Sequence, residues 1–174
     1  MAHISTLGSG IYTYLDIFTG TIAGTEVSAA DYAALFEGGS ADTVRMPSVR
    51  EFPSIGTPAN IVNVPVYGQE TSSQVQGQAD SPTLEVTVNY VPADMEEIHA
   101  LKGQEVAFRF MMAEQEVTVA EGAAATLAKA NTEFYFKGKV EAILVNPALT
   151  DANTATVTLS AQSDFYGPAT IAAS

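Results

Sequence analysis

The sequence contains no cysteine and no tryptophan, and only two of its 174 residues are histidine. The lack of cysteine excludes a disulfide scaffold, a thiolate zinc site and a cysteine nucleophile. The lack of tryptophan, with aromatic residues at 9%, argues against the stacking platform of a sugar-cleaving cleft. We therefore expect a fold that depends on packing alone.

Basic residues are also scarce: 7 Lys and Arg stand against 20 Asp and Glu, which gives a net charge of −13. This balance is the opposite of what binding to nucleic-acid phosphates requires. Charged residues make up 16% of the chain, against about 25% in a typical domain. Such a surface is either simply rich in Ala, Thr and Ser or covered by neighbouring subunits, and the composition leaves both interpretations open.

Known catalytic and metal-binding patterns are missing from the sequence. A hydrolytic triad needs a histidine oriented by a carboxylate beside a nucleophile, but His3 lies near the N-terminus and His99 on a short predicted helix. Glu96 and His99 form one Glu-x-x-His pair, whereas a di-metal carboxylate site needs a second pair on a facing helix. No phosphate-binding glycine motif, nucleophile elbow or calcium loop is present. We predict no catalytic, metal-binding or cofactor-binding residue, and no enzyme activity.

The length of the chain suits a single domain over residues 1–174. The first ten residues lack the basic and apolar regions of a signal peptide, and no run of about 18 apolar residues occurs. We expect a protein that is made and kept in the cytoplasm, with no membrane span.

Alternation of apolar and polar residues predicts a mostly β protein. The clearest strand covers Thr83–Val91, whose two faces differ in polarity. Its inward face contains Leu84, Val86, Val88 and Tyr90, and its outward face contains Glu85, Thr87 and Asn89. The other predicted strands are Ile11–Thr19, Ile61–Tyr67, Glu105–Met112, Glu116–Ala120, Glu133–Val145 and Thr154–Gln162.

Two short helices are predicted beside these strands. Ser28–Glu37 begins with a capping pair, Ser28 and Asp31, and ends at two glycines. Asp94–Lys102 takes Asp94 as its N-cap and ends before a glycine. Helices of this length are marginal in isolation, so each must dock on a sheet. The sequence therefore predicts a mostly β fold with one or two short flanking helices.

Three segments show little periodicity: Gly38–Asn60, Gly68–Pro82 and the C-terminal Asp164–Ser174. Structureless segments longer than about 12 to 15 residues are uncommon in compact domains and are either functional or disordered. Together with the N-terminal Met1–Gly10, these segments are predicted to be loops and arms that order against a neighbouring subunit. Mobile surface loops are the alternative.

The region Asn60–Met112 combines a strand, a long polar loop, an alternating strand, a short helix and a returning strand. Its three diagnostic stretches are Asn60-Ile-Val-Asn-Val-Pro-Val-Tyr-Gly68, Val75-Gln-Gly-Gln-Ala-Asp80 and Leu84-Glu-Val-Thr-Val-Asn-Tyr90. This pattern resembles the major tail tube proteins of long, flexible-tailed bacteriophages. The predicted C-terminal strands are consistent with the resemblance.

The resemblance implies a small β-sandwich or barrel-like tail tube domain with long inter-strand loops and terminal arms. Six copies of it would close into a ring, and the rings would stack into a hollow tube that delivers DNA. It implies as partners other copies of the chain and the tape measure, tail terminator and distal tail proteins of the same virion. DNA would be transported cargo only, and no membrane would be bound. The protein would be made in the cytoplasm of the host bacterium and reside in the tail of the virion.

Two sets of residues are candidates for this role. An acidic wall would keep DNA mobile, because each Lys or Arg at a phosphate adds affinity. The polar face of Thr83–Val91 is therefore predicted to face the lumen, and the polar loop after Gly68 is predicted to bridge subunits. The lumen candidates are Glu85, Thr87 and Asn89, and the inter-subunit candidates are Gln69, Glu70, Gln74, Gln76, Gln78 and Asp80.

Two other functions remain open at this point. A tube subunit of a contractile injection or secretion machine shares the general fold. A β-sandwich module that binds carbohydrate or a cell-surface ligand has a similar strand content, although the lack of tryptophan and of a signal peptide argues against it.

Overall fold

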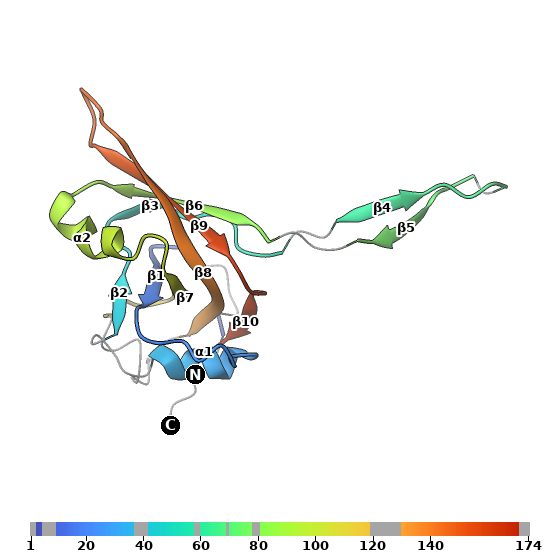
Figure 1. The fold of residues 1–174 in the computed structure, drawn as a ribbon, viewed down its shortest axis with the longest axis horizontal. Coiled ribbons are helices and arrows are strands. Elements are labelled where there is room, and N and C mark those ends of the chain that lie inside the picture. The colour runs from blue at the N-terminus through green and yellow to red at the C-terminus, as the bar shows by residue number, and fades with distance from the viewer. Residues whose placement is uncertain are drawn as a thin grey trace.

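A computed structural model of the chain describes residues 3–4, 10–36, 42–57, 60–68, 70–77, 81–118 and 130–170. These residues form a mostly β fold with two short helices (Figure 1). The strands are β1 (Tyr12–Phe18), β2 (Thr43–Arg45), β3 (Val49–Glu51), β4 (Ile61–Val64), β5 (Ser73–Gln76), β6 (Thr83–Asn89), β7 (Glu105–Ala113), β8 (Asn131–Asn146), β9 (Thr154–Ala161) and β10 (Tyr166–Ala169). The helices are α1 (Ala29–Leu35) and α2 (Pro92–Ala100).

The main sheet is antiparallel and runs in the order β2-β1-β7-β8-β9-β6-β3, with β10 also paired to β8. Its outermost strands, β2 and β3, follow each other directly in the chain, so the sheet curls back on itself. The connection is held at both ends. The Met46 amide donates to the Leu15 carbonyl (2.8 Å), and the Asn89 amide donates to the Ser48 carbonyl (3.0 Å). The result is a curled half-barrel, which confirms the predicted fold class.

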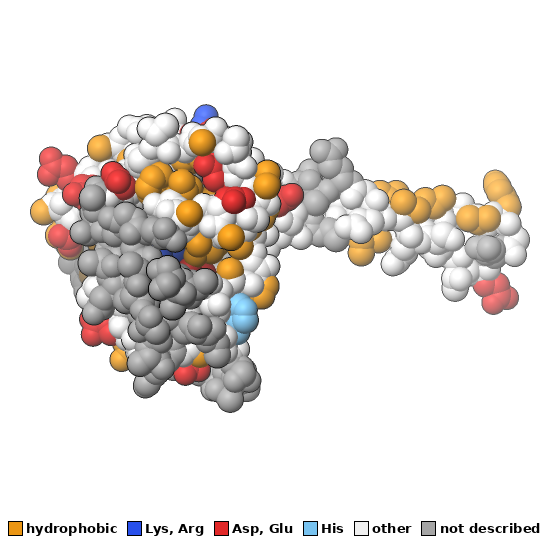
Figure 2. Space-filling view, turned by 90° about the horizontal axis from the view of Figure 1, so that it is seen from below, with side chains coloured by type: hydrophobic (Ala, Val, Ile, Leu, Met, Phe, Trp, Pro, Cys, Tyr) orange, Lys and Arg blue, Asp and Glu red, His pale blue; other side chains and the backbone are white. Residues whose placement is uncertain are grey.

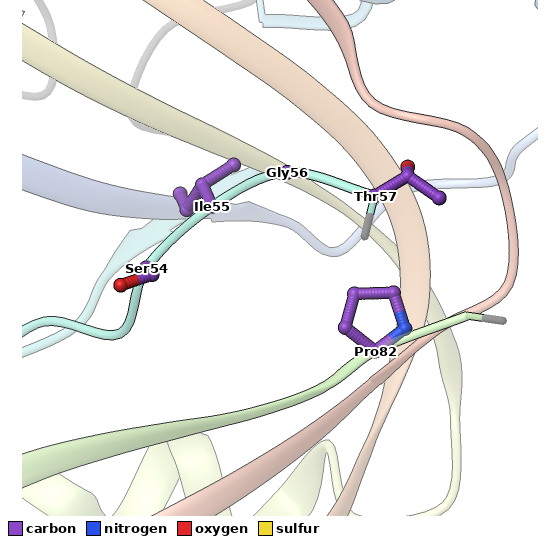
Figure 3. Close-up of a pocket in the computed structure, with 5 residues that line it drawn as sticks. All are labelled: Ser54, Ile55, Gly56, Thr57 and Pro82. Atoms are coloured by element: carbon purple, nitrogen blue, oxygen red, sulfur yellow. The ribbon is translucent and has the colours of Figure 1, made fainter. Parts of the chain in front are cut away.

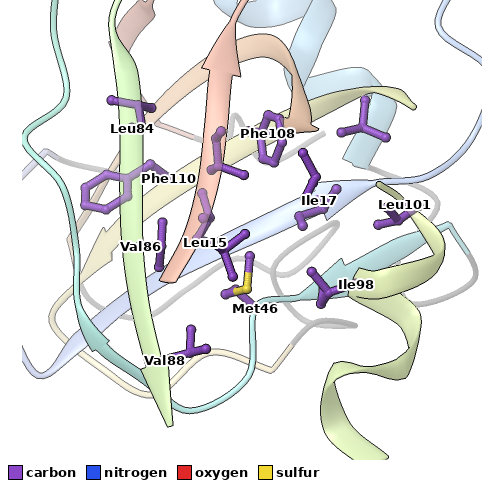
Figure 4. Close-up of a cluster of buried hydrophobic side chains, with 14 of the residues drawn as sticks. Leu15, Ile17, Met46, Leu84, Val86, Val88, Ile98, Leu101, Phe108 and Phe110 are labelled. Atoms are coloured by element: carbon purple, nitrogen blue, oxygen red, sulfur yellow. The ribbon is translucent and has the colours of Figure 1, made fainter. Parts of the chain in front are cut away.

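The curled sheet encloses the main hydrophobic core (Figure 4). Leu84, Val86 and Val88 point inward from β6, as the alternation predicts, and each is at most 3% exposed. Across β7 and β8, the rings of Phe108 and Phe136 stack with their centroids 4.9 Å apart. Helix α2 packs its buried side against the same core. The core therefore draws on both halves of the chain.

The outer face of β7 and β8 is also covered in part. Helix α1 packs there, and the Tyr32 ring lies 5.2 Å from the ring of Tyr166 on β10. A second hydrophobic cluster results, consisting of Phe18, Tyr32, Phe36, Ala107 and Tyr135. Strand β7 is consequently buried on both faces along most of its length.

Both predicted helices are present with shifted bounds. The cap of α1 is confirmed, because the Ser28 hydroxyl accepts a hydrogen bond from the Asp31 amide (3.3 Å). The predicted N-cap of the second helix, Asp94, is wrong: α2 begins at Pro92, and Val91 holds the cap position without a side-chain bond. Proline suits the first turn because it has no amide hydrogen to satisfy. The helix therefore begins before the polar residue that the capping pattern selected.

One predicted strand is wrong. Within Glu116–Ala120, residues 116–118 form no strand, and residues 119–120 lie outside the described residues. Val117 is buried against Met111, so the apolar residue in this stretch reflects packing and not sheet pairing. The other six predicted strands correspond to β1, β4, β6, β7, β8 and β9.

The three aperiodic segments are not loops throughout. Gly38–Asn60 contains β2 and β3, Gly68–Pro82 contains β5, and Asp164–Ser174 contains β10. Each of these strands has only three or four residues, too few for an alternating pattern to stand out. Parts of these segments and most of Met1–Gly10 lie outside the described residues, and their role in assembly stays a prediction.

Gly138 on β8 allows a test of the close packing between β8 and β9. A Cβ at this position would overlap the carbonyl oxygen of Ser160 and press on the Phe108 ring. We expect Gly138→Ala to lower the free energy of unfolding by about 1–3 kcal/mol, the usual cost of overpacking. Chemical denaturation followed by circular dichroism measures this change. Gly10→Ala, where an added Cβ meets only ordinary contacts, is the matched control, and equal stability of the two variants would contradict the described packing.

Candidate assembly surfaces

Strands β4 and β5 form a separate two-stranded ribbon that projects from the half-barrel (Figure 1). The strands are antiparallel, with Val62 opposite Val75. A bond from the Gly77 amide to the Asn60 carbonyl (2.6 Å) extends the pairing toward the body. Every residue of both strands is exposed, so the described part of the same chain does not cover the ribbon.

The two faces of this ribbon differ in chemistry. Opposite residues of an antiparallel pair share a face, and successive residues alternate between faces. One face carries Val62, Val64, Ser73 and Val75, here called the valine face, and the other carries Ile61, Asn63, Gln74 and Gln76, here called the amide face. The three valines are 40–54% exposed, and Figure 2 shows hydrophobic side chains spaced along the ribbon. An isolated hairpin is only marginally stable in water, and exposed apolar surface of this kind is typical of interaction sites.

The predicted inter-subunit residues lie on or near this ribbon. Glu70 is exposed between the two strands, and Gln74 and Gln76 are exposed on the amide face. Gln69, Gln78 and Asp80 lie outside the described residues. Sequence reasoning selected polar residues here and missed the valine face. The available signal was the alternation of Val62 and Val64 in a stretch already predicted as a strand.

A shallow pocket lies where the ribbon leaves the body (Figure 3). It is lined by Ser54, Ile55, Gly56, Thr57 and Pro82. The first four precede β4 and Pro82 directly precedes β6, so the pocket lies between the two connections to the ribbon. The described part of its lining contains no titratable side chain. The pocket therefore suits an apolar contact better than acid–base chemistry.

The predicted lumen residues lie on the outer face of the half-barrel, away from the core. Glu85 is exposed, and Thr87 and Asn89 are half-buried. Their partners on β9, in the same order, are Thr158, Thr156 and Thr154. Hydroxyl groups dominate this face, and Glu85 is the one charged residue that β6 and β9 contribute to it. The face is polar, but it carries less negative charge than the acidic wall that was predicted from the sequence.

A buried ionic network crosses the outer face of β2, β1 and β7. Asp16 accepts hydrogen bonds from Nε of Arg45 (2.7 Å) and from Nη2 of Arg109 (2.7 Å). The Arg45 guanidinium lies 4.0 Å from the centre of the Tyr14 ring, and that of Arg109 lies 4.8 Å from the centre of the Phe36 ring. Asp16 and Arg109 are at most 1% exposed. These ion pairs link the neighbouring strands β2, β1 and β7.

Glu133 on β8 lies in the same buried region. Its carboxylate accepts hydrogen bonds from Nδ2 of Asn131 (2.8 Å) and from the Tyr135 hydroxyl. Burial raises the pKa of Glu133 above its ordinary value, and the charge of Arg109 opposes part of this rise. Sequence reasoning missed Asp16, Arg109 and Glu133 as a group. Each is a charged residue inside an otherwise largely apolar strand, which was the available signal.

The described residues contain no group of three or more His, Cys, Asp or Glu side chains that could hold a metal ion. Glu96 and His99 are both exposed on α2, and His3 is exposed near the N-terminus. Among the same described residues, no helix has the length and apolar character needed to cross a membrane.

No protein-family model matches this chain, and a comparison with curated proteins finds no match. The candidate functional features are therefore the surfaces themselves: the projecting ribbon and the hydroxyl-rich outer face of β6 and β9.

The ribbon leads to a prediction about hydrogen exchange. In dilute protein, the amides of β4 and β5 should exchange rapidly, because a lone hairpin opens easily. If copies associate through the ribbon, the same amides should become protected at high concentration. The amides of β6 and β9, which are paired inside the main sheet, are the internal control and should be protected in both conditions. Full protection of β4 and β5 in the dilute monomer would contradict the need for a partner.

Glu133 leads to a prediction about pH. A carboxyl group whose pKa is raised in the folded state binds its proton more tightly there, so folding stability falls as the pH rises above the ordinary value of 4.5. Glu133→Gln removes this titration. The stability of the variant relative to the natural protein should therefore increase from about pH 4.5 upward. Urea denaturation across a pH series measures the difference, with Glu85→Gln at an exposed position as control. A difference that does not change with pH would contradict the raised pKa.

Proposed function

We propose that this chain is a structural subunit that assembles with copies of itself into stacked rings of six. The rings form the hollow tail tube through which bacteriophage DNA is delivered. The observation that carries the proposal is the projecting ribbon, whose valine face is exposed on an element too small to be stable alone. Contact with a neighbouring subunit would cover this apolar surface and stabilise the ribbon.

The location of the ribbon supports the same proposal. The region that resembles flexible-tailed phage tail tube proteins, Asn60–Met112, contains the ribbon together with β6, α2 and β7. The half-barrel would supply a rigid body for each subunit, and the ribbon would supply the arm that reaches the next one. Body and arm are thus both present within one short chain.

The outer face of β6 and β9 has the chemistry that a conduit for DNA needs. In the proposed tube, Glu85, Thr87 and Asn89 face the lumen together with the threonines of β9. These two strands contribute no Lys or Arg to the face. Because β6 and β9 offer no cation to pair with phosphates, this part of the wall would add little affinity for DNA. The low affinity of this face for DNA would come mainly from its uncharged hydroxyl groups. Glu85 would add one negative charge in each copy.

Electron microscopy of the concentrated, purified protein tests the proposal, and hollow tubes of stacked rings are the expected result. The double variant Val62→Asp, Val75→Asp places carboxylates on the valine face and should abolish the tubes. Circular dichroism and thermal unfolding of the body should stay unchanged, because the ribbon lies apart from the core. Val27→Asp, at a position on the body that is 75% exposed, is the matched control and should still form tubes. Separate single domains at every concentration would overturn the proposal.

A further inference from the structure

Strand β8 is longer than its neighbour β7, and part of its edge is unpaired. On one side, β7 pairs with residues Asn131–Lys139 of β8, and Val140 forms an isolated bridge to Lys102. On the other side, β9 pairs as far as Asn146. The segment Glu141–Asn146, here called the open edge, therefore has no strand beside it on the β7 side among the described residues. An edge of this kind is a template for a strand from another chain.

The open edge and the ribbon each have one apolar side and one mixed side, on which a single apolar residue lies among polar ones. The core side of the open edge carries Ile143 and Val145, next to Val157 and Ala155 of β9, and its outer side carries Leu144 and Asn146, next to Thr156 and Thr154. The ribbon alternates in the same way between its valine face and its amide face. If the ribbon pairs with the open edge, the valine face continues the apolar side of the sheet and the amide face continues the polar side.

The positions of the two elements point to different copies of the chain. Figure 1 shows the end of the β8–β9 hairpin projecting upward and to the left of the half-barrel, whereas the ribbon extends away to the right. The ribbon therefore does not reach the open edge of its own chain. A contact between two different surfaces of identical chains repeats head to tail, and it either closes into a ring or extends as a filament.

The distribution of charge favours a second copy at this place. Each copy carries a net charge of −13, so copies repel one another where acidic surfaces meet. Residues Ala142–Asn146 contain no charged side chain, and neither β4 nor β5 contains one. Glu141, at the bulge that begins the open edge, is the exception. Pairing between these segments brings almost no like charge into contact.

We propose that the ribbon of one copy adds to the open edge of β8 in a neighbouring copy and extends its main sheet. This inference rests on the proposed self-assembly and names the surface that receives the arm. The four-residue strands of the ribbon fit within the length of the open edge. Backbone hydrogen bonds would supply affinity, and the apolar contact of the valine face with Ile143 and Val145 would select the orientation.

Disulfide cross-linking tests the pairing, because the chain has no cysteine and every cross-link must come from introduced residues. Val145→Cys is combined in one chain with a single cysteine on the valine face, at Val62, Val64 or Val75. Side chains opposite each other on one face of a sheet lie within reach of a disulfide. After mild oxidation of concentrated protein, at least one of these variants should give a ladder of multimers on a non-reducing gel. A reducing agent should return the ladder to single chains.

Matched controls combine Val145→Cys with Asn63→Cys or Gln74→Cys, which lie on the amide face. These variants should give no ladder, because their side chains point to the other side of the sheet. Ladders of equal strength from both faces would overturn strand pairing. Electron micrographs of the same samples separate the two proposals. Tubes without cross-links would overturn the pairing and leave the proposed function standing, whereas a lack of both would overturn both.

Discussion

Antiparallel pairing along β8 holds the half-barrel together, since β7, β9 and β10 all pair with this one strand. The first half of β8 lies between the core on one side and α1 on the other, and it contributes Phe136 to the core and Tyr135 to the outer cluster. Gly138 allows β9 to approach closely where the sheet curls. The second half extends beyond β7 and leaves the open edge. A single long strand therefore joins the stable body to a surface suited to assembly.

The body and the ribbon depart from the usual distribution of residues in opposite ways. In the body, Asp16, Arg109 and Glu133 are charged residues with almost no exposure. Such groups are rarely buried unless they are paired, and losing one partner of a buried pair typically costs about 3–5 kcal/mol. In the ribbon, apolar valines are exposed. The ion pairs of Asp16 form within one chain. The described part of that chain does not cover the ribbon, and a second copy would cover it in the proposed assembly.

Long alternating stretches made β6, β7, β8 and β9 predictable, because many residues of each strand repeat the same inward and outward pattern. Alternation along β7 also places Arg109 on the face opposite Phe108. It did not reveal that α1 covers this face, because burial of a second face depends on a helix from a distant part of the chain. Some of the polar residues proposed for the inter-subunit loop lie on β5. The alternation of Val62 and Val64 is visible in the sequence, but only strand pairing places Val75 on the same face.

The sequence by itself determined the mostly β fold class, the inward faces of the long strands and the acidic character of the chain. These properties follow from composition and from local alternation. Only the tertiary structure decided that Gly68–Pro82 contributes a strand to a projecting ribbon, that Asp16 meets two arginines inside the protein, and that β8 extends beyond β7. Each of these features depends on which distant strand lies opposite, and a local sequence pattern carries no information about that partner.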